Sequence, residues 1–398
     1  MTGGGRSLAF VVQRYGADVA GGSESLARAL AERLSPEFQV TVFTTCARDY
    51  VTWRNELPPG SERAGGVEVL RFPVEEERDL DSFNAFSEPL YRAPHSRDDE
   101  LLWLRQQGPY VPRLVDALRE RRDEFDAVFF FTYLYYPTYA GLHAAPERSI
   151  LVSTAHDEPP LRFGLYEEVF RLPRAFAFLT HAEEALVRQR FAVSDRPSVV
   201  AGMGVDVAEV TDEMRQAFRE RHSIRKPYAL YAGRIDAGKG CRQMTSFFES
   251  YLREKGDELE LLLIGRLAMP LPQQAGIRYL GYLSEEEKSA AVAGASVAVC
   301  PSHYESLSIA LLEAFAQSVP GLVNAGSAVL KDHCLRSNGG LYYENGDEFV
   351  EALDVLAAQP SLRRALGTGG RRYVGENYRW DVVLEKYRSL VDRVRTAR

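Results

Sequence analysis

The segment 233–240, Gly-Arg-Ile-Asp-Ala-Gly-Lys-Gly, has the composition of an anion-binding loop. It follows an apolar run at 228–232 that predicts a strand, and it opens a pattern that predicts a helix. A glycine-rich turn at a helix N-terminus offers backbone N–H groups and a positive dipole end, and Arg234 and Lys239 add two cations within reach of one diphosphate. A Walker A loop has Ser or Thr after its lysine to hold Mg²⁺, whereas Gly240 argues against an ATPase or GTPase. An ordinary strand–helix turn with two surface cations is the alternative interpretation.

Two glutamates, Glu305 and Glu313, follow a predicted strand at 296–300. Glu305 falls in the loop after this strand, and Glu313 falls on the next helix, which Ser306 or Ser308 can cap. Apolar residues flank Glu313 on both sides, and a carboxylate in such surroundings is costly unless it has partners. A ribose diol would supply two hydroxyl donors. A partly buried glutamate that is satisfied within its own fold is the alternative.

Runs that predict strands alternate with amphipathic patterns that predict helices along nearly the whole chain. Such alternation builds a parallel sheet covered by helices on both faces, and here it predicts two successive doubly wound sheets. The pattern breaks near 201–208, where Ala-Gly-Met-Gly-Val-Asp suits a linker. The predicted strands span 8–12, 40–44, 67–72, 127–131, 150–153, 175–179, 198–201, 228–232, 260–264, 277–280, 296–300 and 320–323. The predicted helices span 23–34, 100–121, 182–191, 239–253, 284–293, 308–316, 347–358, 361–376 and 381–396.

The composition narrows the class of protein. With 398 residues and a net charge of -8, the composition argues against a nucleic-acid partner, which usually needs a basic stripe, although a local basic patch on one domain stays open. Its four cysteines are scattered without a C-x-x-C pair, which argues against a disulfide framework or a zinc site and favours a reducing compartment. We find neither a signal-peptide pattern nor a run near the ~18 apolar residues of a membrane span. The expected location is cytoplasmic.

Taken together, these motifs resemble the retaining glycosyltransferases of family 4, the glycosyl transferases group 1. The two glutamates are separated by seven residues and lie downstream of the Gly-Arg and Lys-Gly turn, as in that family. Further matches are Gly21-Gly22 at the first helix, His156-Asp157 after a strand, the segment 277–287 that borders the nucleobase, and 339–343. One departure is Ser306-Leu307-Ser308, where the family usually has Gly-Phe-Gly.

The resemblance implies an α/β protein with the GT-B fold. This fold has two Rossmann-like, doubly wound parallel-sheet domains that face a central cleft, and a C-terminal helix that crosses back to the N-domain. The implied domains are an acceptor-binding domain at 1–203, a nucleotide-sugar-binding domain at 204–378, and a C-terminal helix at 379–398 that packs on the first domain.

The resemblance also assigns donor-side roles. Arg234 and Lys239 would neutralise the leaving diphosphate, Glu313 would bind the ribose hydroxyls, and Glu305 would touch the transferred sugar. Together with His156, the residues Arg234, Lys239 and Glu305 form the implied catalytic set. The other implied donor-binding positions are Gly22, Gly233, Gly265, Leu283, Leu307, Ser308 and Ile309.

On the acceptor side, His156 would contact the sugar, and Gly21 and Gly22 would let the N-domain loop approach the phosphate and the acceptor. Asp157 is a further acceptor-side candidate, with Glu158 and His181 as less direct helpers. His156 as a structural histidine and His181 as a simple helix start are the alternatives.

The implied reaction moves a sugar from a nucleoside-diphosphate sugar to a hydroxyl acceptor with retention, and it needs no cofactor and no divalent metal. In this family the leaving phosphate oxygen assists removal of the acceptor proton on the same face. The acidic balance favours a soluble metabolite, natural product or oligosaccharide as acceptor over a lipid. Trp103, Leu104 and Val111 in the predicted helix 100–121, which carries several arginines, allow transient peripheral contact with a membrane.

Several alternatives stay open at this point. A GT-B sugar-nucleotide epimerase, a phosphorylase and a non-catalytic nucleotide-sugar-binding relative share much of the same pattern. The sequence leaves open the donor base, which is that of UDP, GDP, ADP or TDP. It also leaves open the sugar, the acceptor, the linkage and the oligomeric state.

Overall fold

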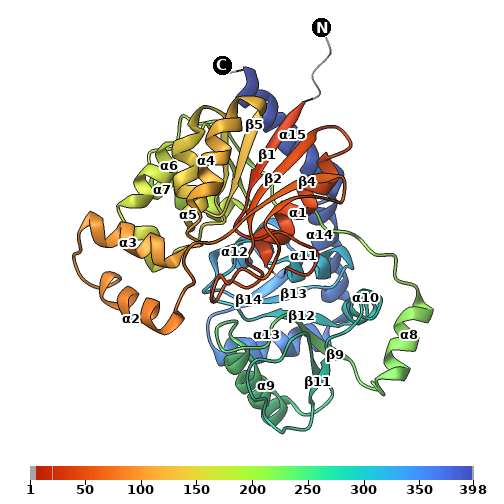
Figure 1. Ribbon diagram of the computed structural model, residues 1–398. Helices are drawn as coiled ribbons and strands as arrows, with labels where there is room; N and C mark the ends of the chain where they lie inside the picture. Colours follow the sequence, from red (N-terminus) through yellow and green to blue (C-terminus); the bar gives the residue numbers. More distant parts are fainter. Residues whose placement is uncertain (1–5, 20, 397–398) are drawn as a thin grey trace. The chain divides into compact units, whose positions relative to one another are not determined.

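A computed structural model describes residues 6–19 and 21–396, which pack as two compact units. The N-terminal unit runs to Ala201 and takes in the chain again from Leu384, and the C-terminal unit spans Gly202–Val383. Each unit holds one sheet with helices packed around it (Figure 1). The first boundary lies two residues before the predicted join at 203/204, and the second lies within the last helix.

The N-terminal unit contains an eight-stranded sheet in the order β3-β4-β2-β1-β5-β6-β7-β8. All neighbouring strands are parallel except the pair β3 and β4, which is antiparallel. The sequence predicted each strand except β3, whose five residues are all exposed and carry no apolar pattern. The strands are β1 (Ser7–Val11), β2 (Gln39–Thr45), β3 (Gly60–Ala64), β4 (Val67–Phe72), β5 (Ala127–Phe131), β6 (Ser149–Val152), β7 (Ala175–Phe178) and β8 (Ser198–Val200).

Helices cover both faces of this sheet, as alternate side chains of β5 show. The ring of Phe129 lies 6.0 Å from that of Tyr387 on the last helix, whereas the next residue, Phe130, packs against Gly141 on α5. Tyr387 is fully buried, and Arg388 beside it donates to Glu37 over 3.1 Å. The last helix therefore returns to the N-terminal unit, as predicted. The helices of this unit are α1 (Gly22–Leu34), α2 (Leu80–Leu90), α3 (Arg97–Gln107), α4 (Pro112–Arg121), α5 (Tyr136–Ala144), α6 (Leu165–Arg171), α7 (His181–Arg190) and most of α15 (Trp380–Thr396).

The single helix predicted over 100–121 is wrong, because the structure has two helices there. Gly108 ends α3 with a φ of 67°, and a proline follows it and removes a backbone donor. The side chains of Trp103, Leu104 and Val111 are at most 2 % exposed. These three residues, with the arginines of the same segment, were the basis for expecting transient membrane contact, and in this fold their side chains are part of the core.

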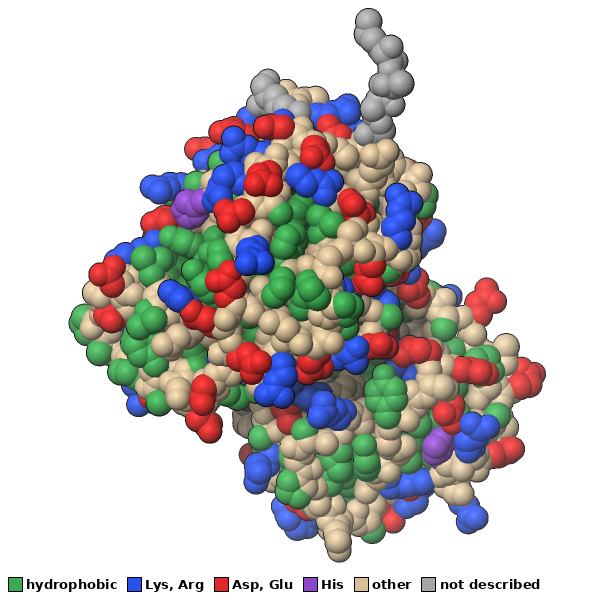
Figure 2. Space-filling view, in the orientation of Figure 1, with side chains coloured by type: hydrophobic (Ala, Val, Ile, Leu, Met, Phe, Trp, Pro, Cys, Tyr) green, Lys and Arg blue, Asp and Glu red, His purple; other side chains and the backbone are tan. Residues whose placement is uncertain are grey.

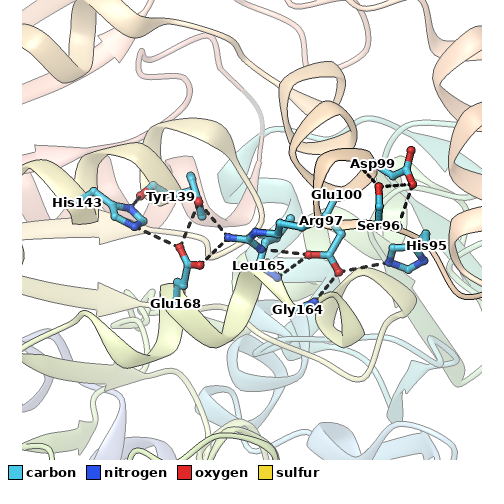
Figure 3. Close-up of polar contacts among 10 residues, drawn as sticks. All are labelled: His95, Ser96, Arg97, Asp99, Glu100, Tyr139, His143, Gly164, Leu165 and Glu168. Atoms are coloured by element: carbon cyan, nitrogen blue, oxygen red, sulfur yellow. Dashed lines mark hydrogen bonds and ion pairs between the residues drawn. The ribbon is translucent and has the colours of Figure 1, made fainter.

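A polar network fixes α3 to the rest of the N-terminal unit (Figure 3). The buried carboxylate of Glu100 accepts hydrogen bonds from the backbone N–H groups of Gly164 (2.6 Å) and Leu165 (2.7 Å) at the start of α6. It also pairs with Arg97, and Arg97 in turn pairs with Glu168 on α6 over 2.7 Å. A carboxylate at a helix N-terminus is favourably placed, and each buried oxygen here has a partner.

The C-terminal unit contains a six-stranded, fully parallel sheet in the order β11-β10-β9-β12-β13-β14. The strands are β9 (Tyr228–Ala232), β10 (Glu260–Ile264), β11 (Ile277–Gly281), β12 (Val297–Cys300), β13 (Gly321–Asn324) and β14 (Gly340–Tyr343). The helices are α8 (Asp212–Arg221), α9 (Cys241–Lys255), α10 (Glu285–Ala293), α11 (Ile309–Ala316), α12 (Ala328–Ser337), α13 (Gly346–Ala358) and α14 (Pro360–Asn377). The sequence predicted all of these elements except α8, α12 and β14.

The surface mixes charges of both signs. On the face drawn in Figure 2, Lys and Arg side chains alternate with Asp and Glu side chains. Within the described residues, no helix is long and apolar enough to cross a membrane. The four cysteines are buried and free of disulfides.

The glycine turn before α9 gives a stability prediction. Gly240 has a φ of 75°, and a Cβ added there would lie 2.3 Å from the backbone oxygen of Pro301. We expect Gly240→Ala to lower the free energy of unfolding by at least about 2 kcal/mol, because both the backbone conformation and the close approach exclude a side chain. Urea denaturation measures this change.

The control is Gly375→Ala on α14, where an added Cβ meets no atom within 4 Å. This change should stabilise by roughly 0.5–1 kcal/mol, as alanine does in a helix interior. Equal unfolding free energies for Gly240→Ala and the wild type would contradict the steric argument.

Candidate functional site

The floor of the candidate site is backbone, where β9 and β10 end side by side. Gly233 follows β9, and Gly265 follows β10, with a φ of 121°. A Cβ on Gly265 would lie 2.2 Å from the backbone oxygen of Gly233, so the two loops touch through their main chains. Gly233 donates its N–H to the carbonyl of Ile264 over 3.0 Å. Glycine at these positions leaves room for a ligand to approach the backbone closely.

Asp236 organises the turn that carries both predicted cations. One carboxylate oxygen accepts the backbone N–H of Lys239 over 2.8 Å, and the other pairs with the guanidinium of Arg234. Burial acts to raise the pKa of Asp236, but these hydrogen bonds and the Arg234 charge hold it below its ordinary value. The Arg234 side chain is 49 % exposed and is therefore accessible to an anion.

Lys239 and Glu305 form an ion pair. The Lys239 ammonium donates to Glu305 over 2.7 Å, and the Glu305 side chain is 17 % exposed. The two residues come from the loops after β9 and β12, which are neighbours in the sheet. An ammonium has three N–H donors, and Glu305 takes one of them. Lys239 can therefore serve an anion and the carboxylate together.

Glu313 finds its partner within its own unit. The Lys288 ammonium on α10 lies 3.0 Å from Glu313 on α11, and it also pairs with Glu285 over 2.9 Å. Although burial lowers the pKa of Lys288, the Glu313 and Glu285 carboxylates raise it above its ordinary value. Glu313 is half-buried and ion-paired, which is the alternative that the sequence left open, and it also lines a pocket.

This pocket has a volume of about 360 Å³, which is within the range of small-molecule sites. Six of the predicted donor-binding positions line it together: Gly233, Arg234, Gly265, Leu283, Ile309 and Glu313. Sequence reasoning did not assign three other lining residues, Tyr282, Glu285 and Lys288, although all three lie in or beside the segment matched to the nucleobase border. The lysine could have been noticed because lysine is rare in this chain.

Two predicted positions near the start of α11 have structural roles. Leu307 is 5 % exposed, and its carbonyl oxygen lies 2.9 Å from the Nε2 of the buried His333. Ser308 occupies the N-cap position with a φ of 63°, but its side chain makes no capping hydrogen bond. Capping of this helix by a serine side chain at position 308 is therefore wrong. Neither residue lines the pocket.

In the N-terminal unit, one of the two glycines predicted at the first helix lies against a buried ion pair. Gly21 is the N-cap of α1 and Gly22 its first residue. A Cβ on Gly21 would lie 2.1 Å from the carboxylate of Glu24, which is 5 % exposed. Glu24 pairs with Arg14 over 2.5 Å and accepts from Gln13 over 3.0 Å. The glycine thus lets the loop lie directly against this pair, which sequence reasoning missed.

His156 lies in the loop after β6 and contacts a carboxylate. Its Nε2 is 3.3 Å from Glu158, which also accepts the hydroxyl of Tyr133 over 2.7 Å. Burial acts to lower the pKa of His156, but Glu158 raises it above its ordinary value.

The other two acceptor-side candidates have ion-pair partners close in sequence. Asp157 is 68 % exposed and lies 3.4 Å from Arg162. His181 begins α7 and lies 3.7 Å from Glu184 on the same helix, in keeping with the helix-start alternative.

A buried carboxylate on α7 stabilises the loop after β6, which carries His156. Glu183 on α7 is 1 % exposed, and it accepts the backbone N–H groups of Ala155 (2.8 Å) and Leu179 (2.6 Å) as well as the hydroxyl of Ser153. Burial raises the pKa of Glu183 to about 7, and the three hydrogen bonds oppose that rise. Glu183 therefore joins the ends of β6 and β7 next to His156, a role that sequence reasoning missed.

The C-terminal unit matches a known family. Residues 213–373 match the sequence model described as "Glycosyl transferases group 1". A Corynebacterium glutamicum protein named GDP-mannose-dependent monoacylated alpha-(1-6)-phosphatidylinositol monomannoside mannosyltransferase is 23% identical over 383 residues, which cover 87% of this chain and 98% of that protein. Glycosyltransferase 1 domain-containing protein 1 of Xenopus tropicalis is 26% identical over 150 residues, which cover 35% of this chain and 42% of that protein.

The fold of the whole chain also has a match among solved structures. Sucrose-phosphate synthase from Thermosynechococcus elongatus superimposes with a TM-score of 0.73 at 17% identity, covering 99% of this chain and 100% of that one. The chain therefore has the GT-B fold, and the prediction of two Rossmann-like units is confirmed.

The cation loop generates a binding prediction. We expect Lys239→Met to weaken binding of inorganic pyrophosphate about ten-fold, because the charge-assisted hydrogen bond of a partly exposed ammonium is lost. Isothermal titration calorimetry measures the affinity. The matched control is Lys255→Met on α9, whose ammonium pairs with Glu351 over 2.6 Å and should not affect the affinity. Unchanged pyrophosphate affinity in Lys239→Met would contradict the anion-binding role.

The Glu183 carboxylate generates a pH prediction. Since its pKa of about 7 lies above the ordinary 4.5, the folded chain holds this proton more tightly than the unfolded chain. Its contribution to stability is therefore complete below pH about 4.5 and is lost as the pH rises through about 7. We expect the free energy of unfolding to fall by up to about 3 kcal/mol more in the wild type than in Glu183→Gln over this window. Urea denaturation at a series of pH values measures this difference. If the unfolding free energies of the wild type and Glu183→Gln change with pH in parallel, the prediction is refuted.

Proposed function

Because residues 213–373 form a glycosyl transferases group 1 domain, we propose that this protein is a retaining glycosyltransferase that uses a nucleoside-diphosphate sugar. The observation that carries the proposal is the pocket that six predicted donor positions line, among them Gly233, Arg234 and Glu313. The acceptor is a hydroxyl group, and no cofactor is needed. The relatives' names support sugar transfer as the class of reaction.

The leaving diphosphate is stabilised by protein cations. Arg234 and Lys239 lie on one turn that Asp236 holds in place, and the turn opens helix α9. As the glycosidic bond breaks, negative charge grows on the phosphate oxygens, and preorganised cations stabilise it most at that moment. The proposed reaction is therefore metal-independent, since these two side chains supply the charge that Mg²⁺ supplies elsewhere.

Retention follows from same-face attack rather than from a covalent intermediate. Glu305 is the carboxylate placed next to the cation loop, and its ion pair with Lys239 at 2.7 Å lowers its strength as a nucleophile. In our proposal Glu305 orients the sugar hydroxyls, and the departing phosphate oxygen takes the acceptor proton. His156, Gly21, Gly22 and Asp157 belong to the N-terminal unit and are proposed to serve the acceptor side.

A soluble acceptor fits the surface better than a lipid. The Corynebacterium relative's name contains a phosphatidylinositol mannoside, but the apolar residues that favoured membrane contact here are buried. The net charge of -8 also disfavours an anionic membrane surface. We propose a metabolite, natural product or oligosaccharide as acceptor and the cytoplasm as location.

The assay incubates the protein with each nucleoside-diphosphate sugar and a pool of soluble hydroxyl acceptors in EDTA. We expect nucleoside-diphosphate release that depends on the acceptor, and a product whose anomeric configuration, read by NMR, equals that of the donor. An inverted product, or activity that EDTA abolishes, would overturn this mechanism. Conversion of the donor without any acceptor would favour the epimerase.

A variant tests the role of Glu305. We expect Glu305→Gln to lower kcat about 100-fold while the affinity for the nucleoside diphosphate stays within a few-fold, because the carboxylate acts on the sugar in the transition state. Glu254→Gln, at an exposed position of α9, is the control and should keep full activity. A trapped glycosyl adduct on Glu305 would replace same-face attack with a covalent mechanism.

A further inference from the structure

One wall of the pocket carries an aromatic ring, a carboxylate and an ammonium in a short segment. Tyr282 and Leu283 follow β11, and Glu285 and Lys288 lie on the first turn of α10. The Tyr282 side chain is 83% exposed, and all four residues line the same pocket as Gly265. This segment lines one pocket together with Gly233 and Arg234 of the turn that holds the diphosphate in the proposed function. A nucleotide bound at that turn can therefore place its base against this segment.

The charged side chains on this wall are positioned by ion pairs with one another. Lys288 lies between two carboxylates, 2.9 Å from Glu285 and 3.0 Å from Glu313. The Lys288 side chain is 28% exposed and is therefore partly shielded from solvent, whereas the Glu285 side chain is 80% exposed. The ion pair with Lys288 holds the Glu285 carboxylate at the pocket. Because this side chain is largely exposed, its carboxylate can also accept hydrogen bonds from a ligand. The next residue, Glu286, lines a different hollow beside Phe218 and Arg221.

The nucleobases differ in how they match a carboxylate beside an ammonium. Guanine presents two parallel N–H groups, N1–H and N2–H, which one carboxylate accepts together, and its O6 accepts from a cation. Uracil and thymine present a single N–H between two carbonyl oxygens, and these oxygens repel a carboxylate. Adenine presents one amino group and a ring nitrogen that accepts. Only guanine pairs both carboxylate oxygens.

We propose that Glu285 and Lys288 select guanine, so that the donor of this enzyme is a GDP-sugar. The proposal rests on the proposed nucleotide-sugar function. Glu285 accepts N1–H and N2–H, and Lys288 donates to O6 while it keeps Glu313 in place for the ribose. Tyr282 offers a flat face on which any base can stack, so it adds affinity but no selectivity.

The test compares GDP, UDP, ADP and thymidine diphosphate by isothermal titration calorimetry on the full chain in EDTA. We expect GDP to bind at least about ten-fold more tightly than the other three, as the loss of a charge-assisted hydrogen bond at an exposed carboxylate implies. In Glu285→Gln the GDP affinity should fall about ten-fold while the UDP affinity is unchanged. Glu286→Gln is the matched control and should retain the wild-type ratio.

The outcomes separate the two proposals. If UDP, ADP or thymidine diphosphate binds as tightly as GDP, guanine selection is overturned and the glycosyltransferase proposal stands. If none of the four binds, the nucleotide-sugar function fails as well. If Glu285→Gln weakens all four equally, Glu285 has no role in base choice and the proposal fails. A thermal melt of each variant that matches the wild type establishes that these changes do not arise from misfolding.

Discussion

The candidate site depends on one constraint of the parallel sheet, which is that all strands end at the same edge. The loops after β9, β10, β11 and β12 therefore converge, and ligands of open α/β sheets bind at such an edge. This brings Arg234, Glu305 and Glu285 into one unit although they are far apart in the sequence. The strand order decides which groups meet. Because β9 lies between β10 and β12, the loop after β9, which carries Arg234 and Lys239, lies between the loops after β10 and β12.

Close approach of backbones is what makes the edge a binding site. Gly265 touches the backbone of Gly233, and Gly240 touches that of Pro301, so neither position has room for a Cβ. The first contact joins the loops after β9 and β10, and the second joins the loops after β9 and β12. These contacts hold the loops close together, so the polar side chains on the loops become neighbours. Main-chain packing therefore fixes the relative positions of these side chains.

Much of the fold could be predicted because parallel strands are buried on both faces and read as continuous apolar runs. β5, β9 and β10 were predicted with their exact bounds for this reason. The failures have equally local causes. β3 is an exposed edge strand without an apolar pattern, and the helix over 100–121 was joined across Gly108 because its amphipathic pattern continues on both sides.

Site residues could be predicted where they share one short sequence motif. They could not be predicted where their interaction partners lie far away in the sequence. Arg234 and Lys239 lie in one loop whose physics is visible in the sequence. Lys288 was missed because its partner Glu313 lies 25 positions away and only the fold brings them together. Glu183 was missed for the same reason, since it binds the backbone at Ala155. Long-range ion pairs leave no local pattern.

The two lysine–glutamate pairs also explain how an acidic chain can hold a diphosphate. Glu305 and Glu313 would repel phosphate if they were unpaired, but each has an ammonium within 3.0 Å. Each ammonium offsets the charge of its glutamate, and the half-exposed Arg234 guanidinium, which Asp236 orients, is accessible to the phosphates at the loop. The carboxylates can then act on hydroxyl and N–H donors of the ligand, which they accept well, without opposing its phosphates. The polarity of the site is thus divided between a cationic turn for phosphate and paired carboxylates for neutral donors.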